Sequence, residues 1–323
     1  MPDNSRMGEF DLIDRFFKRP VRRNALGVGD DCALLAPAPG MQLAVSSDML
    51  VEGRHFLSTA DPARLGHKAL AVNLSDLAAC GARPLAFTLA LALPQADEAW
   101  LAPFARGLLA LADAHGCELV GGDTTRGPLN ICITVFGEVP PGQALLRSGA
   151  RAGDDLYVSG TLGDARLALE IFRGTQGAAA DTFEAARLRM EQPTPRVELG
   201  QRLRGIASAA IDVSDGLLGD LRHVLRQSGV GASVETAQAV ALMQAGAQLD
   251  AERRLEYVLA GGDDYELLFT APPGRRDAVQ DAAAQSRTRV TRIGRVEAEP
   301  GLRLLDAQGQ RIERHYASFD HFA

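Results

Sequence analysis

Aspartate recurs along the chain in short clusters of small residues, most of which lie at the edge of an apolar run. The six clusters are Gly27-Val28-Gly29-Asp30-Asp31, Ser46-Ser47-Asp48, Asn73-Leu74-Ser75-Asp76, Gly121-Gly122-Asp123, Asp212-Val213-Ser214-Asp215 and Gly261-Gly262-Asp263-Asp264. Magnesium takes oxygen ligands and usually sits between one or two carboxylates and the oxygens of a substrate phosphate. Aspartate and glycine also mark solvated turns, so any single cluster is compatible with a turn. Six clusters together favour a phosphoryl-transfer site with several magnesium ions.

Lysine is nearly absent, because Lys18 and Lys68 are the only two in the chain. The sequence consequently has no phosphate-binding loop ending in Gly-Lys-Ser/Thr, no protein-kinase motif set and no Gly-x-Gly-x-x-Gly fingerprint opening a helix. If the protein handles a nucleoside triphosphate, metal ions and arginine must neutralise the phosphate charge. The aspartate clusters would then bind those metal ions.

Spacing decides which of these side chains can act together. Asp30 and Asp31 are adjacent, so in an extended segment only one of them can face a given site. Asn73 and Asp76 lie three residues apart on a predicted helix and share a face. That face is either a ligand pair or a solvated surface of the helix.

Residues of three further segments could contact a nucleotide or its partner substrate. Asp212 and Ser214 share one face of an extended segment, and Asp215 follows where a helix begins, either as a ligand or as the N-cap. His55 stands in a Gly-containing loop and could hold a phosphate or a base, or be a satisfied, partly buried histidine. Arg147, just past a Pro-Pro-Gly linker, can meet phosphate oxygens bidentately, although most surface arginines have no specific role.

The composition is that of a globular protein of one large domain or two ordinary ones. The chain has 323 residues, 46% of them apolar, and a net charge of -7. This charge argues against nucleic acid as the main partner. It permits anionic small substrates, because bound magnesium reverses the local sign of an acidic site. Without a bilayer-spanning apolar stretch or a signal-peptide core, we expect a cytoplasmic protein.

The elements that must position these residues follow from apolar periodicity and from helix and turn signals. The expected helices are 8–19, 61–79, 97–115, 165–172, 182–190, 196–203 and 215–227, and the expected strands are 41–46, 87–93, 118–120, 130–139, 155–159, 209–213, 265–270, 290–296 and 302–304. Pro140-Pro141-Gly142 is the best linker and divides the chain into 1–140 and 141–323. Strands and helices do not alternate strictly, which favours two α+β domains over a doubly wound sheet.

Seven motifs, in their order and spacing, resemble those of the thiamine-monophosphate kinases over nearly the whole chain. They are residues 27–33 (GVGDDCA), 47–56 (SDMLVEGRHF), 73–84, 121–125, 212–221, 261–269 and 320–322. This family is grouped with the ATP-dependent synthetases that make aminoimidazole ribonucleotide and selenophosphate and that mature hydrogenase.

The resemblance implies a two-domain α+β protein that phosphorylates thiamine monophosphate with ATP in thiamine diphosphate biosynthesis. Domain 1–140 would bind metal and nucleotide and pair its sheet across a homodimer. The α/β domain 141–323 would complete an active-site cleft that uses several Mg²⁺ ions. By matching motifs, the metal shell would be Asp31, Ser46, Ser47, Asp48, Asp76, Asp123, Asp212 and Asp215. Gly122, Asp123, Arg147 and Ser214 would bind ATP, while His55, Asp263 and Phe319 would contact thiamine monophosphate. The residues most directly involved in catalysis would be Asp48, Asp76, Asp123 and Arg147.

The sequence departs from the family pattern at three positions. Ser47 and Cys80 stand where threonine and methionine are more frequent. Phe319 stands where tyrosine or tryptophan is common, so the aromatic ring is kept but its hydroxyl or indole N–H is lost. The expected reaction is direct in-line transfer to a phosphate oxygen that is already anionic, so no general base is required. Two alternatives stay open: a related ATP-dependent synthetase of the superfamily, and a non-catalytic magnesium-nucleotide sensor.

Overall fold

The computed structural model describes residues 8–24, 26–314 and 316. The chain folds into two compact units, each with its own sheet. The first unit is the described part of Met1–Leu77 together with Arg83–Pro141, and the second is Ala78–Ala82 together with the described part of Gly142–Ala323. The mixture of helices and sheets agrees with the predicted α+β class. Within the described residues, no helix has the length and apolarity needed to cross a membrane.

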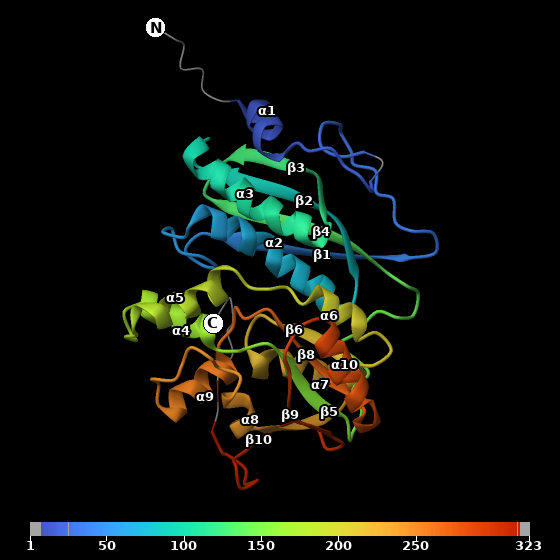
Figure 1. The fold of residues 1–323 in the computed structure, drawn as a ribbon, viewed down its shortest axis with the longest axis vertical. Helices are drawn as coiled ribbons and strands as arrows, with labels where there is room; N and C mark the ends of the chain where they lie inside the picture. Colours follow the sequence, from blue (N-terminus) through green and yellow to red (C-terminus); the bar gives the residue numbers. More distant parts are fainter. Residues whose placement is uncertain (1–7, 25, 315, 317–323) are drawn as a thin grey trace. The chain divides into compact units, whose positions relative to one another are not determined.

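The first unit is a four-stranded sheet in the order β1-β4-β2-β3, with helices α2 and α3 on one face (Figure 1). Its elements are α1 (Glu9–Leu12), η1 (Ile13–Phe17), β1 (Gln42–Val51), α2 (Pro62–Ala79), β2 (Arg83–Leu93), α3 (Glu98–His115), β3 (Glu118–Arg126) and β4 (Asn130–Val139). β4 pairs antiparallel with both β1 and β2, whereas β3 runs parallel to β2. The sheet therefore has β1 and β3 as its two edges.

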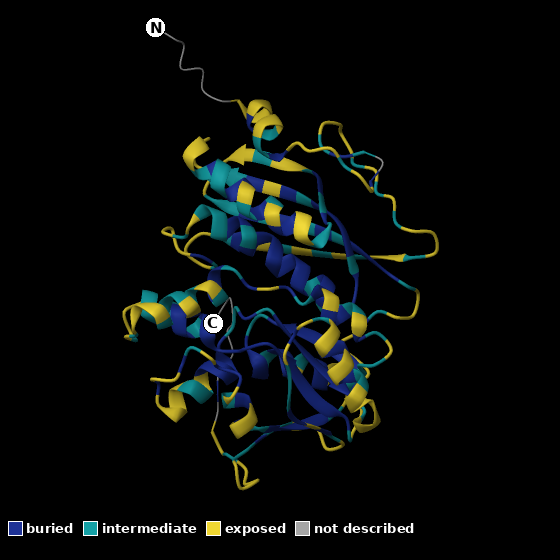
Figure 2. Cartoon of the chain, in the orientation of Figure 1, coloured by how far each residue is buried: buried dark blue, intermediate teal, exposed yellow. Residues whose placement is uncertain are grey.

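The alternation of side chains along β2 and β4 decides which face the helices cover. Phe87 and Leu89 of β2 and Ile133 of β4 are buried beneath them, which leaves smaller or polar side chains such as Ala90 and Cys132 on the other face. Figure 2 shows the resulting buried layer between sheet and helices.

Strands β1, β2 and β3 are all longer than the sequence patterns predicted, and β2 begins at Arg83 instead of Phe87. β1 continues past Ser46 to Val51, and β3 continues past Val120 to Arg126. Asp48 is paired with Ile133 of β4 and Asp123 with Ala90 of β2. The clusters that contain Asp48 and Asp123 therefore lie in edge strands, not in loops. These two strands are long because each pairs with an apolar inner strand. The expected helix 8–19 is instead the short α1 followed by the π-helical turn η1.

The second unit contains a six-stranded sheet in the order β10-β7-β9-β5-β8-β6. Its strands are β5 (Asp155–Ser159), β6 (Ala209–Val213), β7 (Gly231–Glu235), β8 (Glu266–Ala271), β9 (Val290–Glu297) and β10 (Gly301–Leu305). Its helices are α4 (Asp164–Phe172), α5 (Ala180–Glu191), α6 (Val197–Arg202), α7 (Leu217–Ser228), α8 (Thr236–Val240), α9 (Ala251–Ala260) and α10 (Arg276–Gln285), with the 3₁₀ turn η2 (Pro273–Arg275). Sequence patterns missed β7, α8, α9, η2 and α10.

A buried carboxylate at the start of β8 ties this unit together. Glu266 is fully buried and accepts two hydrogen bonds of 2.6 Å from Arg196 and one of 2.7 Å from Arg189. The Ser159 hydroxyl of β5 donates to the same carboxylate. Charge-assisted, bidentate bonds of this kind are strong and geometrically specific. They fix the beginning of β8 and so the turn that precedes it, which carries Asp263.

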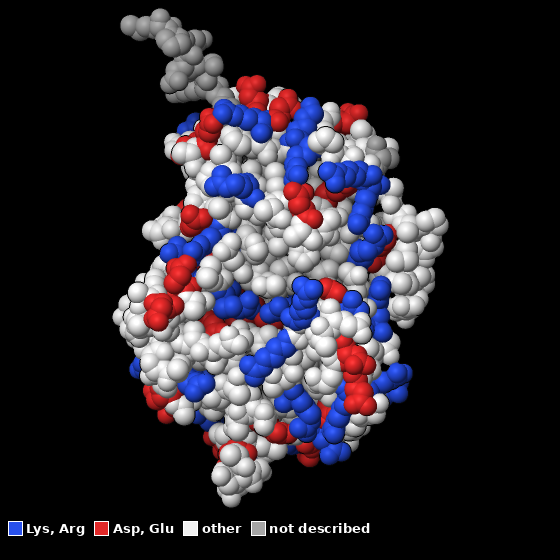
Figure 3. All heavy atoms as spheres, in the orientation of Figure 1, with Lys and Arg blue, Asp and Glu red and all other residues white. Residues whose placement is uncertain are grey.

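Acidic and basic side chains are interspersed over the face of each unit that Figure 3 draws. Exposed ion pairs include Arg19–Asp113 in the first unit and Arg202–Glu198 in the second. Each such exposed pair contributes little stability, because solvent screens it.

Candidate active site

In the first unit, strand β1 and helix α2 bring residues of two clusters together. The Ser46 hydroxyl donates a hydrogen bond to Asp76, and the Asp48 N–H donates to Asn73 Oδ1 at 3.1 Å. Ser46 and Asp48 are two residues apart on a strand and therefore share a face. Asn73 and Asp76 are three residues apart on a helix and also share a face. The Ser46–Asp76 and Asp48–Asn73 hydrogen bonds therefore lie side by side. Asn73 is buried and Asp76 half-buried, so the solvated-surface alternative for this pair is wrong.

Ser47 and Asp123 point to the opposite face of the sheet. Ser47 pairs with Thr134, whose hydroxyl lies 3.0 Å from that of Ser47, and Asp123 lies in register with Ala90 and hence with Cys132. β1 and β3 are also the two edges of the sheet, roughly 14 Å apart at the usual strand spacing. The proposed ligands of this unit thus fall into separate groups and cannot all surround one ion.

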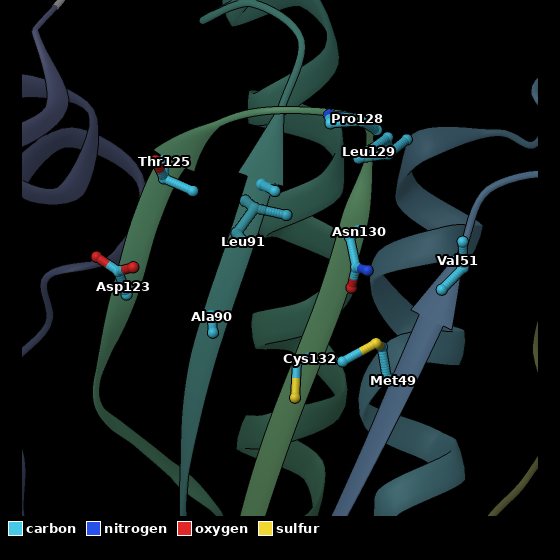
Figure 4. A pocket seen from close by; sticks show the side chains of 11 residues that line it. Met49, Val51, Ala90, Leu91, Asp123, Thr125, Pro128, Leu129, Asn130 and Cys132 are labelled. Carbon is cyan, nitrogen blue, oxygen red and sulfur yellow. The ribbon is translucent and has the colours of Figure 1, made fainter.

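A shallow pocket of about 380 Å³ lies on this second face of the sheet (Figure 4). Its floor is formed mainly by small or apolar side chains of β1, β2 and β4, and its polar members are Asp123, Thr125 and Asn130. Its labelled lining is Met49, Val51, Ala90, Leu91, Asp123, Thr125, Pro128, Leu129, Asn130 and Cys132.

Gly122 needs to be glycine for a steric reason. Its φ of +146° is one that side chains rarely adopt, and a Cβ would lie 1.8 Å from the Leu89 carbonyl oxygen of β2. This close approach of backbones sets the position of Asp123, the next residue. Asp31 is exposed, its N–H donates to Asp30 Oδ1 at 3.0 Å, and the structure does not bring it to the Asp48–Asp76 group through any hydrogen bond among the described residues.

The loop after β1 fixes the ring of His55. The Val51 N–H donates to His55 Nδ1 at 2.9 Å, and the His55 N–H donates back to the Val51 carbonyl oxygen at 2.9 Å. Because Nδ1 accepts a hydrogen bond, the proton of the neutral ring sits on Nε2. His55 is half-buried and is therefore a positioned hydrogen-bond donor.

In the second unit, the turn between β6 and α7 carries Ser214 and Asp215. Both backbone N–H groups donate to Asp220 Oδ2, at 3.0 and 3.1 Å. Burial and the neighbouring charge of Asp215 raise the pKa of Asp220 to about 7. Gly216 is the N-cap of α7, so the alternative that Asp215 is the N-cap is wrong. Asp212, on β6, is buried.

Arg147 belongs to the same neighbourhood as this turn. At Asp220, burial and the charge of Asp215 raise the pKa, and the positive charge of Arg147 opposes that rise. At His223, burial lowers the pKa, and the charges of Arg226 and Arg147 lower it further. The loop that carries Arg147 is tied to the end of α7, because the N–H groups of Gly149 and Ala150 donate to the Ser228 hydroxyl at 3.1 and 3.2 Å. Helix α7 therefore holds two segments expected to bind ATP.

The turn from Gly261 to Tyr265 lies against the same β6–α7 connection. The Asp263 N–H donates to the Ser214 carbonyl oxygen and the Tyr265 N–H to that of Val213, both at 2.8 Å. Asp263 and Tyr265 have φ values of +72° and +51°, which are uncommon outside glycine. Strained backbone of this kind clusters at functional sites. Phe319, the third expected contact to the acceptor substrate, lies outside the described residues.

The donor atoms present suit magnesium better than a thiolate- or imidazole-binding metal. The candidate ligands are carboxylates and hydroxyls, which are the oxygen donors that Mg²⁺ takes. Among the described residues, no three His, Cys, Asp or Glu side chains are grouped so that they could hold a metal ion by themselves. Magnesium rarely uses an all-protein cage and is commonly completed by phosphate oxygens and water, so the donor set fits this ion.

Sequence reasoning missed one residue that shapes the site, Asp220, and the structural role of another, Asn73. Asn73 was considered only as a partner of Asp76, yet its carboxamide accepts the Asp48 N–H and donates to the Ala69 carbonyl oxygen at 3.0 Å. Asp220 was not singled out at all. Its signal is an aspartate inside the apolar stripe of α7, between Leu218 and Leu221, where a charge is buried only if it has partners.

Comparison with known proteins agrees with this architecture. Residues 29–139 match the AIR synthase related protein, N-terminal domain, and residues 151–307 match the AIR synthase related protein, C-terminal domain. The thiamine-monophosphate kinase of Salmonella typhimurium is 46% identical over 325 residues, which cover 98% of each chain. The crystal structure of thiamine-monophosphate kinase from Stenotrophomonas maltophilia is 46% identical with a TM-score of 0.83, covering 90% of this chain and 92% of that one. AaThiL complexed with AMPPCP and TMP is 30% identical with a TM-score of 0.76, covering 89% of both chains.

The two domain matches and the two sheets define a protein of the AIR synthase related class. Within that class, the high sequence identity to thiamine-monophosphate kinases extends over nearly the whole chain. The chain belongs to the thiamine-monophosphate kinase family.

Proposed function

We propose that the chain phosphorylates thiamine monophosphate with ATP, giving thiamine diphosphate and ADP by direct in-line transfer. The observation that carries this proposal is identity of 46% over 98% of the chain with a thiamine-monophosphate kinase. A relative complexed with an ATP analogue and TMP supports the same pair of substrates. The cytoplasmic location stays a prediction from the sequence.

Magnesium is part of the proposal because of the oxygen donors described above. In the first unit, Asp31, Ser46, Ser47, Asp48, Asp76 and Asp123 are the proposed ligands, and in the second unit Asp212 and Asp215. Bound Mg²⁺ would supply charge neutralisation at the phosphate oxygens. Support comes from the Ser46–Asp76 and Asp48–Asn73 pairs, which preset two carboxylate-bearing segments.

The substrate contacts are proposed from the matching motifs and from local geometry. Gly122, Asp123, Arg147 and Ser214 would bind ATP, and His55, Asp263 and Phe319 would contact thiamine monophosphate. His55 Nε2–H suits an anionic phosphate, because its Nδ1 already accepts the Val51 N–H. The guanidinium of Arg147 would neutralise charge on the transferred group.

The chemistry requires alignment more than proton transfer. The acceptor is a phosphate oxygen that is already anionic near neutral pH, so no side chain has to remove a proton before attack. The bond from that oxygen to the γ-phosphorus forms while the bond to the β–γ bridging oxygen breaks, and ADP leaves with the electron pair. The side chains of the site then hold the two phosphates in line and compensate their charge.

ADP release tests the proposed function directly. We expect ADP to form from ATP and Mg²⁺ only when thiamine monophosphate is added, with thiamine diphosphate produced in equal amount. A coupled ADP assay together with chromatography of the thiamine esters measures both products. ADP release without any thiamine ester would instead indicate a related synthetase, and binding of ATP without any turnover would indicate a sensor.

We also propose a homodimer, in which the sheet of the first unit pairs with that of a second copy. Strand β1 is an edge strand whose Leu43, Val45 and Met49 are 48%, 59% and 52% exposed. The shallow pocket of Figure 4 lies on the same face of the sheet. A closed symmetric pair would cover this apolar edge, which is otherwise a site for aggregation.

Light scattering at micromolar concentration should give twice the mass of the chain. Val45→Asp should shift the protein to monomer, because it places a charge in the middle of the exposed β1 face. Leu188→Asp, at an exposed position of α5, is the matched control and should stay dimeric. A wild-type monomer, or equal dissociation by both variants, would reject the β1 face as the interface.

A further inference from the structure

The turn that carries Ser214 and Asp215 depends on one side chain of the following helix. Two consecutive backbone N–H groups point to the same oxygen of Asp220, at 3.0 and 3.1 Å. The Asp220 N–H in turn donates to the Gly216 carbonyl oxygen at 3.0 Å. The carboxylate thus closes the turn against the first turn of α7.

We propose that Asp220 is a positioning residue, which holds the Ser214–Asp215 turn in the conformation that receives magnesium-bound ATP. This inference rests on the proposed function, which assigns Ser214 to ATP and Asp215 to a metal ion. Asp220 itself is 4% exposed, and the oxygen it directs to the turn already accepts two N–H groups. It acts on the nucleotide through the backbone of its neighbours.

Removal of the Asp220 carboxylate leaves two backbone N–H groups without their partner. Half-buried donors of this kind must find another acceptor, so the turn rearranges or opens to water. Gly216, at φ +108°, has the conformational freedom to follow such a change. Ser214 and Asp215 would then be displaced from the nucleotide.

The neighbouring turn with Asp263 shares one hydrogen bond with the Ser214–Asp215 turn, from the Asp263 N–H to the Ser214 carbonyl oxygen, and has two further supports outside it. The Tyr265 N–H donates to the carbonyl oxygen of Val213, which belongs to β6 and not to the turn. The buried carboxylate of Asp264 accepts the Gly163 N–H with both oxygens, each at 3.1 Å. Loss of Asp220 should therefore disturb the ATP side of the site more than the thiamine monophosphate side.

Two substitutions separate the role of geometry from the role of charge. Asp220→Ala removes the acceptor and should weaken binding of a magnesium-bound, non-hydrolysable ATP analogue at least tenfold, with the KM for thiamine monophosphate changed less than threefold. Asp220→Asn keeps an oxygen that can accept both N–H groups, so its Kd for the analogue should stay within threefold of wild type. Calorimetric titration gives the Kd, and steady-state kinetics gives the KM.

Asp164→Ala is the matched control for the loss of a buried carboxylate. Asp164 is 1% exposed, and its Oδ1 accepts two backbone N–H groups, of Gln244 and Ala245, at 3.1 and 2.8 Å. This variant should lower the melting temperature without weakening the binding of the ATP analogue.

Several outcomes would overturn the inference. If Asp220→Asn binds the analogue as weakly as Asp220→Ala does, the negative charge of Asp220 acts on the nucleotide directly. If Asp164→Ala weakens binding of the analogue as much as Asp220→Ala does, the effect comes from general destabilisation of the fold. If Asp220→Ala does not fold, Asp220→Asn decides alone, and a Kd raised more than tenfold rejects positioning. A wild type that binds the analogue but does not phosphorylate thiamine monophosphate contradicts the proposed function only, because the Kd values still decide the role of Asp220.

Discussion

Asp76→Asn should lower kcat about a thousandfold while the protein stays folded, a loss of about 4 kcal/mol of transition-state stabilisation. The carboxylate is proposed to bind a magnesium ion that neutralises phosphate charge, and an amide carries no charge. The amide oxygen can still accept the Ser46 hydroxyl, so the contact between α2 and β1 is retained. Turnover measured across a magnesium titration, beside a thermal melt of each variant, tests this expectation.

Asp48→Asn and Asp123→Asn extend the same experiment to the two faces of the sheet. Both should lose activity with little change in melting temperature, because both are proposed metal ligands on paired strands. Asp281→Asn, an exposed position of helix α10, is the matched control and should turn over normally. Near-normal turnover of all three site variants would overturn the magnesium assignment.

Unphosphorylated thiamine should be a poor acceptor, at least about a thousandfold slower than thiamine monophosphate at equal concentration. A neutral alcohol needs a general base, and it lacks the phosphate charge that the proposed magnesium ions and Arg147 would hold. His55 is the side chain of the proposed acceptor contacts most suited to that role. Its Nδ1 accepts the Val51 N–H at 2.9 Å, which leaves the ring proton on Nε2. A ring in this state donates a hydrogen bond rather than removing a proton.

A competition assay with equal thiamine and thiamine monophosphate measures this selectivity. Chromatography should find thiamine diphosphate as the sole new ester at early times. Comparable formation of thiamine monophosphate from thiamine would overturn both the acceptor assignment and the mechanism without a base. A thiamine rate that rises with pH through the neutral range would specifically point to a titrating base at the site.

The sequence by itself indicated the chemistry and located most of the elements. The aspartate clusters, the scarcity of lysine and the order of the motifs already indicated magnesium, ATP and the family. Strands such as β4, β5 and β6 and the helix from Pro62 were predicted at or near their observed bounds. Local signals suffice there, because apolar periodicity and a proline at a helix start act within a few residues.

The tertiary structure alone decided how the clusters are divided. The lengthening of β1 and β3 depends on pairing with inner strands distant in sequence, and this pairing sends Ser46 and Asp48 to one face and Ser47 and Asp123 to the other. Periodicity cannot reveal this division, because it does not contain the order of strands in a sheet. The role of Asp220 was hidden for a related reason. A buried carboxylate is explained only by the backbone groups that fold against it, and those appear only in three dimensions.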